Sequence, residues 1–271
     1  MCNSDHVVTR LAKWTAAIAL SLGVVHAAGD PRNPKAQEAH EWAYDGEGGP
    51  DHWGELAPEF AECSHGLLQS PIDIVSRQAS ERFGGSPQFF YGASRLEVIH
   101  KEHTIEVDYE PGSFIQVGRN RYELLQFHFH APSEHTVEGG AQFPVEMHLV
   151  HVSPTGSLAV VGVLIREGEE NEALRAVWEN LPTAGGETVH ADGEIEVEAI
   201  LPDDRRAYHY SGSLTTPPCS EGVRWMVLRT PVEMSSAQIQ QFRDAIGAEC
   251  CEANARPAQP LNDRLFGLDV F

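Results

Sequence analysis

The sequence predicts a mainly β fold of the α+β type: a large, twisted, mostly antiparallel central sheet with peripheral helices in a single domain. Short runs rich in β-branched and aromatic residues follow one another closely from residue 89 onward. Glycine, proline and asparagine separate most of these runs, which is typical of antiparallel strands joined by short turns. Residues 40–271 contain neither an internal repeat nor a linker, and this length is ample for a sizeable core.

The N-terminus has the features of an export signal. Arg10 and Lys13 supply positive charge before the apolar run 14–25, which is shorter than the about 20 residues that span a bilayer. Val25-His26-Ala27 has the small-residue pattern of a cleavage site. We therefore expect residues 1–28 to be a signal peptide, 29–40 a flexible leader and 41–271 the folded domain. The mature protein is expected to be periplasmic or secreted, with no membrane span.

The elements of the domain follow from the local patterns. Residues 42–60 are rich in turn-forming and aromatic residues and are expected to pack without regular structure. After a short strand near residue 74, strands are expected at residues 89–91, 96–99, 103–109, 114–117, 121–130, 145–152, 158–165, 195–199, 208–211 and 223–228. Helices are expected at 171–181, ended by Pro182, and at 235–246, with Ser235 as the N-cap and Gly247 after the last turn.

Two of the expected strands carry histidines in a pattern that suggests a metal site. In the run 126–130, His128 and His130 share one face of the strand, because strand side chains alternate. Phe127 and Phe129 occupy the other face. In the run 145–151, His148 stands on another strand. Imidazoles from neighbouring strands could converge on one point, which is the ligand set of an open zinc site.

Each histidine run also places a polar residue two positions before a candidate ligand. Gln126 precedes His128, and Glu146 precedes His148. On a strand these pairs lie on the same face, so each polar side chain could accept the free imidazole N–H and fix the tautomer. A single buried histidine would more often be a core residue, but the doublet, the third histidine and the two partners favour metal binding.

Charge and cysteine content limit the function further. The formal net charge of −21 argues against nucleic acid or an anionic membrane as a partner, and solubility is its simplest explanation. Cys2 would leave with the signal peptide. The four remaining cysteines (Cys63, Cys219, Cys250 and Cys251) allow three pairings, and an oxidising compartment makes a long-range disulfide plausible.

With these motifs in place, the chain resembles an α-class carbonic anhydrase of the bacterial exported type over residues 42–264. The resemblance is carried by seven motifs in the family's order, at residues 49–53, 69–74, 126–130, 133–137, 146–151, 213–218 and 256–261. It implies that residues 41–271 are a catalytic domain of this family.

The resemblance implies one zinc ion per chain, held by His128, His130 and His148, with water in the fourth position. The implied reaction is the reversible hydration of carbon dioxide to bicarbonate and a proton, by attack of zinc-bound hydroxide. It implies carbon dioxide and bicarbonate as the small-molecule partners, and a homodimer is expected only at the level of the family.

The resemblance also assigns roles around the metal. The Thr215 hydroxyl would donate to the buried carboxylate of Glu134 and accept from the zinc hydroxide. Its backbone N–H, with Thr216 beside it, would help to bind the substrate. Because carbon dioxide has no charge or net dipole, its pocket should be apolar. Matching to the family gives the lining residues as Val150, Val160, Leu214, Val223 and Trp225.

The resemblance also connects several positions with proton transfer. His103 matches the family's proton-shuttle histidine, and an imidazole that titrates near neutral pH suits that role. Tyr44 matches a tyrosine near the solvent network. Lys101 and Glu106 depart from the family, which usually has an asparagine and an amide there, and both border the proton path. These departures put the efficiency of proton transfer in doubt rather than the reaction.

The resemblance pairs Cys63 with Cys219, a disulfide that would hold the loop carrying Thr215. Cys250 and Cys251 have no family counterpart. They could form an intersubunit bridge, a vicinal disulfide or two free thiols, and the sequence does not choose among these.

Two other functions compete with the lyase. A catalytically silent relative would use the scaffold for recognition, but such relatives typically lose a zinc histidine. A zinc hydrolase of esters or phosphates would use the same hydroxide, but a narrow apolar pocket without a second metal cluster disfavours this as the main role.

Overall fold

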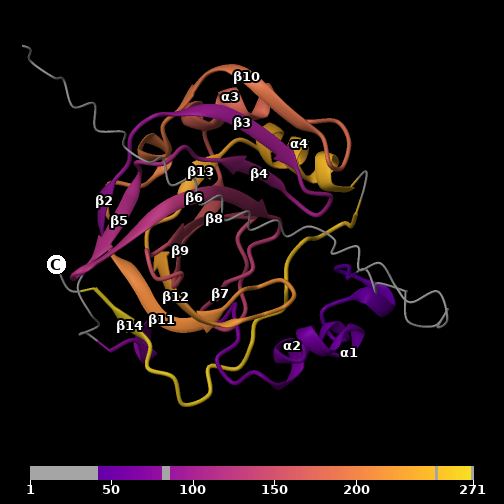
Figure 1. Ribbon diagram of the computed structural model, residues 1–271, viewed down its shortest axis with the longest axis vertical. Helices are drawn as coiled ribbons and strands as arrows, with labels where there is room; N and C mark the ends of the chain where they lie inside the picture. Colours follow the sequence, from indigo (N-terminus) through magenta and orange to yellow (C-terminus); the bar gives the residue numbers. More distant parts are fainter. Residues whose placement is uncertain (1–41, 81–85, 248–249, 270–271) are drawn as a thin grey trace, which may run out of the picture. The chain divides into compact units, whose positions relative to one another are not determined.

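A 12-stranded sheet is the main feature of this computed structural model (Figure 1). The structure describes residues 42–80, 86–247 and 250–269. The expected signal peptide (1–28) and leader (29–40) lie outside the described residues. The main path of the sheet is β10-β3-β4-β6-β8-β9-β12-β11-β14, with β5 pairing β6, β2 pairing β5, and β13 pairing β9.

Strands and helices have the following bounds. The strands are β1 (Asp73–Ile74), β2 (Gln88–Phe90), β3 (Ser94–His100), β4 (Ile105–Asp108), β5 (Phe114–Val117), β6 (Asn120–His130), β7 (Thr136–Val137), β8 (Val145–Val152), β9 (Leu158–Glu167), β10 (Thr188–Ile195), β11 (Ala207–Ser213), β12 (Glu221–Leu228), β13 (Val232–Met234) and β14 (Gly267–Leu268). The helices are α1 (Trp53–Leu56), α2 (Glu62–His65), α3 (Arg175–Trp178) and α4 (Ser236–Gly247). Five 3-10 turns complete the set: η1 (Gly46–Gly48), η2 (Pro58–Phe60), η3 (Ser76–Gln78), η4 (Glu172–Leu174) and η5 (Val197–Ile200).

The strand pairing confirms the expected mainly antiparallel sheet. Within the large sheet, β9 makes the parallel pairings, with β12 and with β13. β1 and β7 form a separate parallel pair. The parallel β9–β12 pairing brings residues 159–162 beside residues 224–227, and it therefore joins the centre of the chain to its C-terminal third.

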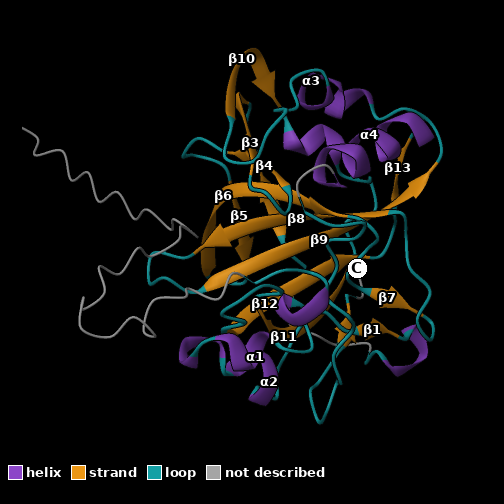
Figure 2. Cartoon of the chain, turned by 90° about the vertical axis from the view of Figure 1, so that its right-hand side faces the viewer, coloured by secondary structure: helices purple, strands orange, loops and turns teal. Residues whose placement is uncertain are grey.

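The two faces of the sheet bury different kinds of side chain. Phe127 and Phe129 on β6 are fully buried in the larger hydrophobic cluster. The Phe129 ring packs against Trp178 of α3 at 5.1 Å and Phe242 of α4 at 5.8 Å between ring centroids. In Figure 2, α3 and α4 lie together above β6, β8 and β9, and α1 and α2 lie below these strands. The face opposite to Phe127 and Phe129 is therefore the one that carries His128 and His130.

The second expected helix is confirmed, with its cap. α4 begins at Ser236, and the backbone N–H of Gln238 donates to Oγ of Ser235 at 3.2 Å, so Ser235 is the N-cap. The first expected helix is shorter than predicted, since residues 171–181 contain η4 and the four residues of α3.

The expected strand at 195–199 is wrong. β10 ends at Ile195, and Val197–Ile200 is a 3-10 turn in which the Ala199 N–H donates to the Glu196 carbonyl at 3.1 Å. The Val197 N–H is taken by the Tyr109 hydroxyl at 3.2 Å, so it does not join a strand ladder. A run of alternating Val, Glu, Ala and Ile fits a tight turn as well as a strand.

The N-terminal part also differs from expectation. Residues 42–60 contain η1, α1 and η2, each a single turn of three or four residues. Such short turns show no helical period in a sequence. The strand expected to begin at residue 103 begins at Ile105. His103 therefore lies on the loop before β4.

Among the described residues, none of the helices combines the length and the apolar character that a membrane crossing requires.

Candidate metal centre

Three imidazoles meet on one face of the sheet. β6 and β8 are antiparallel neighbours, and their register places His128 directly opposite His148. His130 follows two residues later on the same face. One ring nitrogen from each of the three side chains lies within 4.8 Å of the other two. The structure thus brings together the three histidines that the sequence predicts as a metal site.

Each ring has one nitrogen close to an acceptor. Nδ1 of His128 lies 2.8 Å from Oε1 of Gln126, and Nδ1 of His130 lies 2.7 Å from the carbonyl oxygen of Asn254. Nε2 of His148 lies 3.0 Å from Oε1 of Glu146. An acceptor at one nitrogen holds the proton there and leaves the lone pair on the other. The nitrogens that remain for a metal are Nε2 of His128, Nε2 of His130 and Nδ1 of His148.

The electrostatics of the rings fit a divalent cation. Burial lowers the pKa of His130 to about 4, and burial also lowers the pKa of His128 and of His148. All three rings are therefore neutral at pH 7, the form that binds metal. Nε2 of His130 is buried without a hydrogen-bond partner. A buried nitrogen without a hydrogen-bond partner, among neutral imidazoles, fits a zinc ion, which proteins bind mainly through histidine nitrogen and cysteine sulfur.

Glu134 lies beside these rings and is fully buried. Its Oε1 accepts the backbone N–H of Arg256 at 2.9 Å, and the Thr215 side chain acts on it by lowering its pKa. Its Oε2 lies 3.6 Å from Nε2 of His130 and 3.9 Å from Nδ1 of His148. Burial raises the pKa of Glu134 to about 7, which His148, Thr215 and the Arg256 N–H oppose.

A row of apolar side chains runs beside His148. The register places Val150 on β8 opposite Val160 on β9, and Val160 opposite Trp225 on β12. The Trp225 ring lies 4.8 Å from the His148 ring between centroids. Val223 belongs to the same hydrophobic cluster and Leu214 packs against it. The expected pocket residues are thus grouped next to the histidines.

Thr215 and Thr216 lie on the loop between β11 and β12, and this loop is fastened at its C-terminal end. The Cys219 N–H donates to the Thr216 carbonyl at 2.9 Å. Cys219 forms the expected disulfide with Cys63, across a sequence separation of 156 residues. Both cysteines are buried, so the covalent link to α2 is shielded from solvent.

His103 and Tyr44 lie together in an aromatic group at the N-terminal side. The His103 ring lies 4.3 Å from the Trp42 ring and 5.8 Å from the Tyr44 ring between centroids. Burial raises the pKa of the Tyr44 hydroxyl, and the negative charge of Glu134 adds to that rise. Tyr44 is therefore protonated at neutral pH.

Lys101 and Glu106 form an ion pair with each other. Nζ of Lys101 lies 3.1 Å from Oε1 of Glu106, whose side chain is mostly buried on β4. Burial raises the pKa of Glu106, and Lys101 opposes the rise. The register sets Glu106 opposite His128, so this ion pair borders the histidine centre.

Some contributors to the centre were not assigned from the sequence. His135 donates its backbone N–H to Oε2 of Glu146 at 2.8 Å, and its Nδ1 lies 2.7 Å from Oε1. It thereby fixes the carboxylate that faces His148. The Ser133–Val137 motif contained this residue, but its partner on β8 could not be read from spacing.

Asn254 and Arg256 were also missed as site residues. Asn254 acts through its backbone carbonyl, which any residue could supply, so its identity carries no signal of this role. The Arg256 guanidinium is buried and donates to the carbonyl oxygens of Ser70 and Cys63, both at 2.8 Å. It anchors the segment whose backbone N–H reaches Glu134.

Comparison with known proteins agrees with this geometry. The model of the eukaryotic-type carbonic anhydrase family matches residues 48–267. A carbonic anhydrase of Nostoc sp. is 42% identical over 237 residues, which is 86% of this chain and 88% of that protein. A carbonic anhydrase of Pectobacterium carotovorum is 39% identical over 254 residues, covering 94% and 99% of the two chains.

A solved structure is similar in three dimensions as well. The α-carbonic anhydrase of Thermovibrio ammonificans, solved with the inhibitor sulfanilamide, superposes with a TM-score of 0.80 at 44% identity. The match covers 84% of this chain and 98% of that one. The family match, the relatives and the shared fold together place this chain in the eukaryotic-type, or α, carbonic anhydrase family.

Proposed function

We propose that the protein catalyses the zinc-dependent, reversible hydration of carbon dioxide to bicarbonate and a proton. The observation that carries the proposal is the convergence of three neutral imidazoles, from His128, His130 and His148, each with its other nitrogen 2.7–3.0 Å from an acceptor oxygen. When bound there, zinc would make a water molecule acidic enough to provide hydroxide at neutral pH, the chemistry for which carbonic anhydrases are the type case.

Thr215 and Glu134 orient the attacking oxygen in this proposal. The Glu134 carboxylate would accept the Thr215 hydroxyl proton, so the Thr215 oxygen could then only accept from a third group; the effect of Thr215 on the pKa of Glu134 supports this pairing. An oxygen nucleophile that donates to Thr215 is left with a lone pair directed at the substrate carbon. The N–H of Arg256 on Oε1 favours the ionised, accepting form and opposes the rise that burial causes in the pKa of Glu134.

The apolar row holds the substrate and keeps water away from it. Carbon dioxide has no charge or net dipole, so burial against Val150, Val160 and Trp225 suits most of its surface. Leu214 and Val223 extend that surface, and Thr215 and Thr216 lie at its polar side. The grouping of these residues in one hydrophobic cluster beside His148 supports the assignment.

His103 takes the proton from the centre to solvent. Its ring lies outside the histidine centre, on a loop beside Tyr44, and an imidazole can accept and release a proton near pH 7. Tyr44, protonated and close to both His103 and Glu134, would order the water between them.

The location of this activity is part of the proposal. The charged and apolar runs of residues 1–28 support export to the periplasm or beyond. The buried Cys63–Cys219 disulfide is consistent with an oxidising compartment. A homodimer is expected only at the level of the family.

Stopped-flow measurement of carbon dioxide hydration tests the function. The zinc-loaded protein is expected to hydrate carbon dioxide, and removal of zinc with a chelator is expected to abolish the activity until zinc is restored. Zinc-loaded protein without any hydration activity would leave a silent binding protein as the answer. Efficient ester or phosphate hydrolysis without hydration would favour the hydrolase.

A further inference from the structure

Two adjacent cysteines lie beside the proposed proton shuttle. Cys250 and Cys251 form a disulfide with each other, with their Cα atoms 3.8 Å apart. Of the three states that the sequence left open, the structure has the vicinal disulfide. The pair begins three residues after the end of α4, and the Cys250 N–H donates to the Ile246 carbonyl at 2.9 Å.

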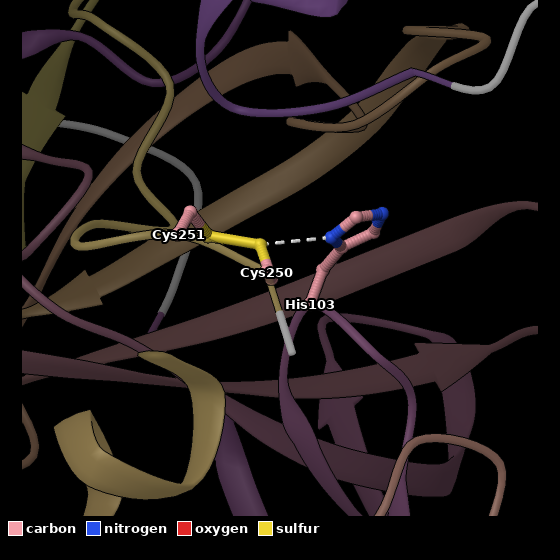
Figure 3. Close-up of side chains that lie close together, drawn as sticks. All are labelled: His103, Cys250 and Cys251. Atoms are coloured by element: carbon pink, nitrogen blue, oxygen red, sulfur yellow. Dashed lines mark hydrogen bonds between the residues drawn. A yellow bond between two sulfur atoms is a disulfide. The ribbon is translucent and has the colours of Figure 1, made fainter. Parts of the chain in front are cut away.

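The disulfide contacts His103 through one sulfur. Figure 3 shows the His103 ring directed at Cys250, and Nδ1 lies 3.0 Å from Sγ. The ring also packs against Trp42, at 4.3 Å between ring centroids. The imidazole thus contacts both an indole and the disulfide.

The contact does not depend on the disulfide alone. Nδ2 of Asn254 donates to the His103 carbonyl at 2.8 Å and to the Phe129 carbonyl at 3.0 Å. The segment that carries Cys250 and Cys251 is therefore fastened to the His103 loop three residues further along the chain. Opening the disulfide leaves this fastening in place, and the two sulfurs stay near the imidazole.

The three side chains together offer a set of metal ligands. One ring nitrogen of His103 and the two sulfurs lie within 4.8 Å of one another. Thiolate sulfur and imidazole nitrogen suit thiophilic cations such as zinc, cadmium or copper(I). In the disulfide, however, the sulfurs are bonded to each other and neither is a thiolate.

We propose that reduced Cys250 and Cys251, together with His103, form a binding site for a thiophilic metal cation, and that the vicinal disulfide keeps this site closed. The site is separate from the centre of His128, His130 and His148. Its consequence for catalysis, removal of His103 from proton transfer, rests on the proposed function, whereas the binding of the cation does not.

The opening step is a thiol–disulfide exchange with a dithiol reductant. One thiolate of the reductant attacks a sulfur of the pair, and the S–S bond breaks to give a mixed disulfide and one protein thiol. The second thiol of the reductant displaces the other protein sulfur. The reductant leaves as a cyclic disulfide, the protein gains two electrons and two protons, and binding of the cation releases the thiol protons. Cys250 is half-buried, whereas Cys251, Cys63 and Cys219 are buried, so Cys250 is the sulfur that a reductant reaches first.

Cadmium ion is the probe for the test. Zinc-loaded protein is treated with dithiothreitol, freed of it without air, and titrated with Cd²⁺ while the sulfur-to-cadmium charge-transfer absorption is recorded. Reduced protein is expected to bind one Cd²⁺ per chain with this absorption, and untreated protein is expected to show none. Zinc retained by the protein is measured in the same samples.

Matched variants locate the site. The double variant Cys250→Ser, Cys251→Ser is expected to abolish the absorption, and because it keeps Cys63 and Cys219 it reports any contribution from them. His103→Gln is expected to weaken Cd²⁺ binding on the order of tenfold or more, since even the loss of a group that only supports a ligand costs that much. His190→Gln, on the exposed edge strand β10, is the control and should bind as the parent does.

The outcomes separate the two proposals. Absence of the absorption in reduced protein, equal absorption in the double-serine variant, or unchanged affinity in His103→Gln would overturn the site. In reduced protein, Cd²⁺ is expected to slow carbon dioxide hydration at low buffer, with recovery on adding imidazole. Normal absorption with an unchanged rate would overturn the link to proton transfer. Normal absorption in a protein without hydration activity would overturn the proposed function and leave the cation site standing.

Discussion

At the scale of single residues, the candidate centre is defined by which nitrogen of each imidazole is taken. The acceptors are of three kinds: the Gln126 amide, the Asn254 carbonyl and the Glu146 carboxylate. The first and third are visible in the sequence because they stand two residues before a histidine on a strand. The second is a backbone carbonyl 124 residues further along the chain, and no local sequence pattern indicates it.

Replacement of one proposed ligand should remove the metal. His128→Ala is expected to lose zinc and hydration activity together, because a site with two imidazoles and two coordination positions without a protein ligand binds zinc weakly. Zinc content by elemental analysis and the stopped-flow rate measure the two effects. Full zinc occupancy in His128→Ala would contradict the ligand assignment.

Glu134→Gln tests the orientation of Thr215. A glutamine amide can donate as well as accept, so the Thr215 hydroxyl no longer has one defined direction. We expect zinc to be retained and kcat to fall on the order of 100-fold, as for the loss of a positioned proton acceptor. A parent-like kcat would show that the hydrogen bond between Glu134 and Thr215 does not act in the reaction.

His103→Ala tests the proton path. The variant should keep zinc and lose on the order of tenfold or more in kcat at low buffer concentration. Added imidazole buffer should restore most of the rate, because a soluble base can replace the missing side chain. A rate that is low and insensitive to imidazole would point to damage elsewhere in the site.

At the scale of elements, prediction succeeded where the pattern was long and alternating. Strands at 114–117 and 145–152 have the expected bounds, and 121–130 differs by one residue. The strands at 121–130 and 145–152 carry the histidines, so the centre could be predicted with them. Prediction failed where an element was one turn long, as in α1, or where the same residues fit two structures, as in η5. The parallel pairing of β9 with β12 depends on long-range topology, which local patterns do not contain.

The loop that carries Thr215 depends on a covalent link. Cys63→Ala with Cys219→Ala removes the disulfide and frees a loop of 156 residues in the unfolded chain. On the chain-entropy model the double variant loses about 4–5 kcal/mol of the free energy of unfolding. Urea unfolding of the variant and the parent gives the difference. Cys250→Ser with Cys251→Ser is the control, since it removes a disulfide that closes almost no loop, and equal losses in both would contradict the explanation.

At the scale of the whole molecule, the sheet gathers distant segments onto one face. The histidines come from the middle of the chain, Thr215 and Trp225 from its last quarter, and the Asn254–Arg256 segment from near its end. The opposite face is filled by the larger cluster with α3 and α4, so the centre stands on a rigid support. Which face would carry the centre was predictable from alternation on β6. Which C-terminal residues would complete it was not, because that requires the folded chain.

The buried histidines make stability depend on pH. His151 lies on the core face of β8, its Nε2 is 2.8 Å from the Tyr91 hydroxyl, and burial lowers its pKa to about 3. Its pKa in the unfolded chain is about 6.5, so the unfolded state binds a proton that the folded state does not. The stabilisation is complete above pH 6.5 and is lost as the pH falls from there toward 3.

Urea unfolding between pH 7 and pH 4 measures this effect. The parent is expected to lose stability steadily as the pH falls, and His151→Phe is expected to lose it less steeply, whatever its stability at pH 7. An identical slope in the two proteins would show that His151 is not the group that takes up the proton on unfolding.

The side chain and carbonyl of Asn254 reach four groups: the His103 and Phe129 carbonyls, the Ala131 N–H and the His130 ring. Asn254 therefore links His103, where a proton would leave the protein, to His130, a proposed ligand of the zinc ion. The His103 loop and the end of β6 are thus held in position relative to each other by a single residue.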